Sequence, residues 1–249
     1  MKSCWAACLD GCSGKISREH IVSRSLFEGE AVKVFGFPWC KDEEKEISLP
    51  SLTAKILCVK HNNNLSEVDT AGADAFAVFR EMTRLSNVRE KMKPHRWRVV
   101  RYSINGLLLE RWFLKTLINI SLNSKYPIGK LAIDAGQPSD ILVKIAFGCH
   151  AFTGRSGLYS AVHVGQKVDS SDKVGFAPLI KENNYIDGGL FSFRGFRFLL
   201  FLDAEGPPER LTGIGFPGDD WSNSQLNYHN KKINFTLGKY LSQVVEITW

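Results

Sequence analysis

Two groups of cysteine and histidine residues, far apart in the sequence, constrain the fold of this chain more than any other feature. Cys4, Cys8 and Cys12 lie near its start, and Cys58 and His61 form a Cys-x2-His pair further on. Structural zinc prefers four thiolate or imidazole ligands in a tetrahedron, commonly supplied by two short-spaced pairs. One upstream pair plus Cys58 and His61 would complete such a site and pin two distant segments together.

The choice among the upstream cysteines is open at this stage. Cys12 is the firmest ligand because it leads directly into a predicted strand, and either Cys8 or Cys4 would join it. Cys40 and Cys149 have no partner at ligand spacing and are interpreted as small apolar residues. The alternative is that all six cysteines are buried free thiols.

Composition indicates a globular chain of an ordinary kind. Its 249 residues are 44% hydrophobic and 23% charged, enough for one large domain or two small ones. No apolar run reaches the roughly 18 residues that a membrane span requires. The N-terminal segment carries too short an apolar run for a secretory signal. That favours the cytoplasm, where thiols stay reduced, and six cysteines that are not spaced as a disulfide framework then indicate metal ligation.

The pattern along the chain predicts an α+β fold. Apolar residues recur at helical spacing from Leu65 to a stop at Pro94, and again from about Leu107 to Leu122. After Pro127 the chain changes to short apolar runs between Gly, Pro and Asn, which is typical of a β-rich domain. We expect that change near residues 123–138. The predicted strand-like runs are "DILVKIAFG", "SGLYSAVHVG", "GGLFSFRGFRFLLFL" and "SQVVEIT".

A carboxylate and an imidazole lie side by side in the segment "GKISREHIVSRSLF". Glu19 and His20 sit between the β-branched residues Ile16 and Ile21, in a sequence that reads as a strand. Neighbouring side chains of a strand point to opposite faces, so a single packing role does not explain both. A surface ion pair is the simplest alternative to a functional site.

The stretches "CSGKISREHIVSRSLF" and "ILCVKHNNNLSEVD" together resemble the HNH nucleases, the ββα-metal group, in the variant with Glu before His. That variant has cysteines ahead of an E-H-I strand, and a C-x2-C-N or C-x2-H-N turn that opens a helix. The resemblance covers roughly residues 4 to 70. It implies an N-terminal zinc-stabilised module (residues 1–95 with its helix). The residue pattern, and not the resemblance, predicts residues 96–249 as a helix plus a β-rich domain of unknown role.

The resemblance also implies catalytic roles. His20 would be the general base that takes a proton from the attacking water, a task suited to an imidazole. Glu19 and Asn62 would hold a catalytic Mg²⁺ or Mn²⁺ on the scissile phosphate. The chain departs from the family at its last position, which falls around Leu65 or Ser66. The auxiliary candidates nearby, which could equally cap the helix, are Asn63, Asn64 and Asp69.

Positive charge is concentrated between residues 80 and 101. Eight Lys or Arg against two Glu give that stretch +6, the same as the net charge of the whole chain. Such clusters contact nucleic-acid phosphates, although a solvated helix face is the alternative. The predicted phosphate contacts are Arg80, Arg84, Arg89, Lys91, Lys93, Arg96 and Arg98.

Taken together, these features predict a metal-dependent endonuclease that hydrolyses DNA, in the phage or mobile-element conflicts where such nucleases occur. Two alternatives stay open: an RNA-directed nuclease, and a non-catalytic zinc-stabilised nucleic-acid-binding module. The C-terminal domain could bind a protein partner or a second copy of the chain.

Overall fold

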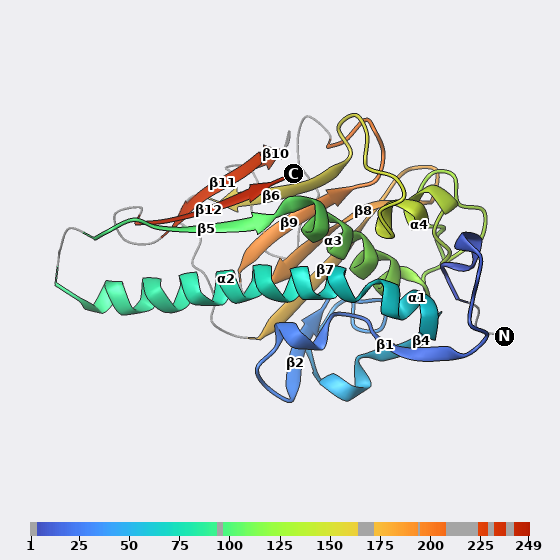
Figure 1. Cartoon of the computed structure of the whole chain (residues 1–249), viewed down its shortest axis with the longest axis horizontal. Coiled ribbons are helices and arrows are strands. Elements are labelled where there is room, and N and C mark those ends of the chain that lie inside the picture. Colours follow the sequence, from blue (N-terminus) through green and yellow to red (C-terminus); the bar gives the residue numbers. More distant parts are fainter. Residues whose placement is uncertain are drawn as a thin grey trace.

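The fold has mixed α and β structure, as the sequence predicts (Figure 1). A computed structural model describes residues 4–93, 97–163, 172–193, 195–207, 224–228, 232–237 and 242–249. Among these residues the α-helices are α1 (Val59–Asn64), α2 (Ser66–Lys91), α3 (Gly106–Ser121) and α4 (Asp140–Ala146). None of them is both long and apolar enough to cross a membrane.

The N-terminal part is built on a two-stranded antiparallel sheet. β1 (Ile16–His20) pairs with β4 (Thr53–Cys58), so that Ile16 lies opposite Cys58 and His20 lies opposite Thr53. The chain then passes directly from β4 into α1 and α2. Two antiparallel strands are therefore followed directly by helices in this part of the fold.

Seven strands form the largest sheet, and two of them come from the N-terminal part. β2 (Ala31–Phe35) pairs with β3 (Lys45–Ser48) and runs parallel to β7. Residues before and after the predicted boundary therefore share one sheet. Its order is β10 (Ser224–Tyr228), β6 (Gly157–His163), β9 (Phe196–Phe201), β8 (Ile186–Phe193), β7 (Lys173–Ile180), β2 and β3.

A smaller sheet joins the end of the chain to the segment after α2. It contains β11 (Lys232–Leu237), β12 (Gln243–Thr248) and β5 (Val100–Asn105), with β12 parallel to β5. Asn105 at the end of β5 caps α3, because its side-chain oxygen accepts a hydrogen bond from the Leu108 N–H at 3.1 Å.

α3 is the central helix and is buried along almost its whole length. It lies between α2 and the strands β8 and β9 (Figure 1). Phe113 packs on Phe191 and Phe198 of the large sheet, with ring centroids 5.1 and 4.9 Å apart. On the other side, Gly72 of α2 lets the Trp112 ring approach so closely that an added Cβ would lie 2.5 Å from it.

The two long helices confirm the sequence prediction, whereas one predicted strand is wrong. The run "DILVKIAFG" forms helix α4, because Leu142, Val143, Ile145 and Ala146 recur at helical spacing and are all buried. The division into 1–95 and 96–249 stays a prediction. One hydrophobic cluster spans both parts.

Candidate functional site

Three thiols and one imidazole converge where β4 meets α1. The ligand atoms of Cys4, Cys12, Cys58 and His61 all lie within 4.8 Å of one another. The three sulfur atoms are 3.3, 3.6 and 3.4 Å from His61 Nδ1, in that order. A tetrahedral zinc, with bonds of about 2.3 Å to sulfur and 2.0 Å to nitrogen, would separate such atoms by about 3.5 Å. The residues therefore fit a metal ion of this kind.

Local backbone structure brings these four side chains together. Asp10 and Gly11 both have positive φ angles, which turn the chain back so that Cys12 returns towards Cys4. Backbone hydrogen bonds then fasten this loop to β4 and α1, from the Trp5 N–H to Ile56 O at 3.1 Å and from the Val59 N–H to Lys15 O at 2.9 Å.

We call Cys4, Cys12, Cys58 and His61 the thiol cluster. The charges in this cluster favour a bound cation. Burial raises the pKa of the Cys12 thiol to about 11, and the neighbouring Cys4 and Cys58 add to that effect. Burial also acts to raise the pKa of Cys58, but hydrogen bonds, above all from the backbone N–H groups of His61 and Ser13, lower it to about 6. Three crowded thiols cannot all ionise without a positive partner. Four protein ligands would leave no open position, which is the mark of a structural site.

The remaining cysteines lie outside this cluster. Cys4, rather than Cys8, is the second upstream member. Cys8 is exposed and lies beside Asp140. Cys40 is buried like a small apolar residue, with its thiol 3.8 Å from Val34 O. Cys149 is exposed and is not a member of the cluster.

A second polar cluster surrounds Glu19 near the other end of the β1–β4 pair. Glu19 is buried and forms an ion pair with Lys115 Nζ of α3 at 2.5 Å. The same ammonium group lies 2.7 and 2.6 Å from the two carboxylate oxygens of Asp69. Ser23 donates to Asp69 at 2.6 Å and accepts from the Trp112 indole N–H at 2.9 Å. We call Glu19, Lys115 and Asp69 the carboxylate cluster.

Lys115 lies where a divalent cation bound to Glu19 and Asp69 would sit. Its side chain is only 2% exposed, and its three ammonium hydrogens face these two carboxylates. A divalent ion on these oxygens would lie next to the ammonium group, which repels it, and would replace the hydrogen bonds that this group donates to them. The residues therefore do not fit a Mg²⁺ or Mn²⁺ ion held by Glu19 while Lys115 is in place.

Burial has different consequences for Glu19 and His20. It raises the pKa of the Glu19 carboxyl group, against the opposing effects of Lys115 and of a hydrogen bond from Asn62. It lowers the pKa of the half-buried His20, and the positive charges of Arg24 and Lys115 act in the same direction. His20 is therefore a neutral imidazole at neutral pH, which is the form that can accept a proton.

α3 holds the end of β1 in position. The Asn119 side-chain N–H donates to the His20 carbonyl oxygen at 3.4 Å, and Asn119 accepts a hydrogen bond from the Trp5 indole at 3.2 Å. The backbone of His20 is thus connected both to the central helix and to the segment that carries Cys4.

The three asparagines after His61 differ in burial and in hydrogen bonding. Asn62 is half-buried and hydrogen-bonds Glu19, whereas Asn63 and Asn64 are exposed. None of the auxiliary candidates caps α2, since its N-cap residue is Leu65 and no side chain makes a capping hydrogen bond there. Asp69 has instead joined the carboxylate cluster.

The basic stretch divides into buried and exposed residues. Arg89 is buried, donates to Ser242 Oγ at 2.8 Å and lies over the Trp97 ring, so it has a structural role and we remove it from the predicted phosphate contacts. Arg80 donates to Leu26 O at 2.8 Å, and Arg84 pairs with Glu81. Arg96 lies outside the described residues. The exposed side chains are Arg84, Lys91, Lys93, Arg98 and Arg101.

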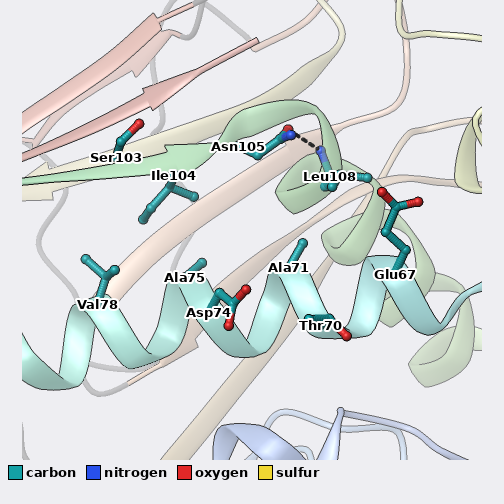
Figure 2. A pocket seen from close by; sticks show the side chains of 10 residues that line it. All are labelled: Glu67, Thr70, Ala71, Asp74, Ala75, Val78, Ser103, Ile104, Asn105 and Leu108. Atoms are coloured by element: carbon teal, nitrogen blue, oxygen red, sulfur yellow. Dashed lines mark hydrogen bonds between the residues drawn. The ribbon is translucent and has the colours of Figure 1, made fainter.

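A cavity of about 420 Å³ lies on a different face of α2, between that helix and the start of α3 (Figure 2). Glu67 and Asp74 are among the residues that line it, and no Lys or Arg is. The cavity contains none of the predicted catalytic residues. Its acidic lining does not suit a nucleic-acid phosphate.

Sequence reasoning missed Lys115, Ser23 and Asn119. A signal for Lys115 existed: it is a single cation inside the apolar helical run "WFLKTLINI". A lysine at such a position must find a buried negative partner, because an unpaired charge in an apolar core is very costly. The sequence offered no way to identify that partner as Glu19 and Asp69.

No protein-family model matches this chain, and neither does any curated protein or solved structure that was compared with it. The interpretation therefore depends on the geometry of the two clusters.

Proposed function

We propose that this chain is an endonuclease whose active site is an HNH-like ββα module stabilised by zinc. One observation carries the proposal. β1, β4 and α1 bring Glu19, His20 and Asn62 into one neighbourhood beside a cluster of three cysteines and a histidine that could hold a metal ion. These are the residue types, in the chain order, of the family that the sequence resembles.

His20 would act as the general base. Its neutral imidazole takes a proton from water, the water oxygen bonds to phosphorus, and the bond from phosphorus to the 3′-oxygen breaks. The leaving oxygen takes its proton from solvent. Arg24 is half exposed and its charge acts on His20, so it is available to a phosphate bound there. Zinc at the thiol cluster would hold the segment before β1 against the turn between β4 and α1.

The substrate class in this proposal is DNA, with RNA as the alternative. The exposed cations after residue 84 support a nucleic-acid partner. None of the residues proposed for cleavage lies in the seven-stranded sheet. Binding of a protein partner by the C-terminal part stays a prediction.

A second candidate is a non-catalytic nucleic-acid-binding module with the same zinc site. One observation favours it: Lys115 already forms ion pairs with Glu19 and Asp69, so its ammonium group occupies the place of the expected divalent cation. In that reading His20 is only a half-buried residue at the end of β1.

The test uses the purified full chain, with zinc content measured before and after. Supercoiled plasmid DNA and a single-stranded RNA are incubated in buffer freed of divalent cations by a chelating resin, and separately with Mg²⁺ or Mn²⁺. Nicked or linear plasmid supports the proposal, and cleaved RNA alone moves it to the RNA alternative. Binding without cleavage in every buffer would contradict it and favour the binding module.

A further inference from the structure

The carboxylate cluster already contains a cation. Lys115 is among the largest fully buried side chains, and its ammonium group contacts Glu19 and Asp69 at distances between 2.5 and 2.7 Å. The ammonium group is a compact point charge with three donors, and three carboxylate oxygens satisfy them. Such an arrangement is complete without any further ion.

The residues around Lys115 hold it in this position. Trp112, one turn earlier on α3, donates to Ser23, which in turn donates to Asp69. Asn119, one turn later, donates to the His20 carbonyl oxygen. Three positions along one face of α3 therefore bind the segment that carries Glu19 and His20.

We infer that Lys115 is the resident cation of this site and takes the place of the divalent ion that the HNH resemblance implies. Its fixed charge keeps Mg²⁺ and Mn²⁺ off Glu19 and Asp69 and orients Glu19 beside His20. Lys115 is a positioning residue, because its buried ammonium group reaches phosphate only through these neighbours. Cleavage by His20 would then need no divalent ion in solution. The inference rests on the proposed function only where cleavage is measured. The metal-binding measurements do not depend on it.

Metal binding can be tested without any nucleic acid. Protein with its zinc content verified is titrated with Mn²⁺, and free Mn²⁺ is followed by electron paramagnetic resonance. We expect no stoichiometric Mn²⁺ site in the parent chain. Lys115→Met should bind one Mn²⁺ at least tenfold more tightly than the parent, because it leaves the buried Glu19 and the partly buried Asp69 carboxylates without a cation. Asp69→Asn added to Lys115→Met should remove that site, and Lys130→Met, at an exposed lysine, should behave like the parent.

Two results of the Mn²⁺ titration would overturn the inference. One is a parent chain that binds Mn²⁺ stoichiometrically and loses the site on Glu19→Gln or Asp69→Asn. The other is a folded, zinc-loaded Lys115→Met that takes up no Mn²⁺. If Lys115→Met does not fold, NMR of the parent chain with ¹⁵N-labelled lysine still tests whether a divalent ion binds beside Lys115. The protected Nζ signal of Lys115 should stay unchanged at millimolar Mg²⁺, and a shift that follows Mg²⁺ binding would contradict the inference.

The cleavage measurement separates failure of the inference from failure of the proposed function. Cleavage in divalent-free buffer by zinc-loaded parent supports both. Cleavage only after Mg²⁺ or Mn²⁺ is added contradicts the inference and leaves the nuclease proposal standing. No cleavage in any buffer contradicts the nuclease proposal, while the Mn²⁺ titration still judges the role of Lys115.

Discussion

The thiol cluster and the carboxylate cluster are built from neighbouring segments, yet they balance their charges in different ways. Cys4, Cys12, Cys58 and His61 crowd three thiols together and have no cationic side chain in the cluster. Glu19 and Asp69 share the ammonium group of Lys115, which reaches them from the central helix. The first arrangement calls for a metal ion, and the second makes one unnecessary. A family resemblance that implies metal at both places is therefore supported at only one.

The difference arises from where each cluster obtains its members. All four ligands of the thiol cluster come from the first 61 residues, within the reach of the HNH resemblance. The carboxylate cluster obtains its cation from α3, about 45 residues beyond residue 70, where that resemblance ends. A motif-based prediction describes the first cluster well because its chemistry is local to the motif. It fails at the second because tertiary packing adds a residue.

The largest expected effect tests whether the thiol cluster binds a structural zinc ion. Cys58→Ser should abolish zinc binding and unfold the N-terminal module, since structural zinc contributes on the order of 10 kcal/mol in small zinc modules. Cys8→Ser is the matched control: its thiol is exposed and outside the cluster, so we expect stability within about 0.5 kcal/mol of the parent. Elemental analysis should find about one zinc per chain in the parent and in Cys8→Ser.

Equal melting of Cys58→Ser and the parent would mean that the four side chains hold no structural metal ion. Loss of zinc from Cys8→Ser instead of Cys4→Ser would exchange the two upstream ligands. The sequence does not decide this choice, because Cys4 and Cys8 lie eight and four residues before Cys12, one and two steps of the same four-residue spacing. The positive φ angles of Asp10 and Gly11 and the burial of Cys4 decide it in the structure.

An effect of intermediate size tests His20, which lies next to the carboxylate cluster. Under single-turnover conditions His20→Ala should slow cleavage by roughly 10² to 10⁴, the usual cost of losing a general base. Zinc content, folding and DNA binding should not change. His150→Ala, at an exposed histidine, should cleave like the parent. Cleavage by His20→Ala at the parent rate would exclude the mechanism.

The pH dependence of the same reaction identifies His20 independently. Because burial and the charges of Arg24 and Lys115 lower its pKa, the imidazole stays neutral below its ordinary value of about 6.5. Activity should therefore be complete at neutral pH and fall with a midpoint below 6.5 as the base becomes protonated. Arg24→Gln removes a positive neighbour, raises the pKa of His20 and should move that midpoint to higher pH. An unchanged midpoint would indicate another base.

Much of the fold follows from the sequence, and the exceptions have physical causes. The apolar periodicity of α2 and α3 is long and regular, so both helices appear where predicted. The seven residues of α4 were too short to distinguish from a strand by periodicity alone. The pairing of β2 with β7 depends on contacts between residues that are far apart in the sequence, which no local pattern encodes.

The smallest expected effect concerns the far end of α2, away from both clusters. With 26 residues at about 1.5 Å each, α2 spans roughly 39 Å, so Lys91 at its last position lies far from Asp69 in its first turn, and Lys93 follows just beyond the helix. The basic stretch should therefore contribute affinity, and no part of the chemical step.

Replacing Lys91, Lys93 and Arg98 by Gln should weaken binding equally on all sequences and lower the salt slope by roughly one unit per lost phosphate contact. The single-turnover rate at saturating DNA should not change. Arg89→Gln separates charge from structure. Arg89 is buried against Ser242, so its loss should cost about 1.5 to 3 kcal/mol of stability and leave the salt slope near that of the parent. A slope that falls with Arg89→Gln but not with the triple variant would reverse these roles, because it would mean that the buried guanidinium group, and not the exposed cations, contacts the phosphates.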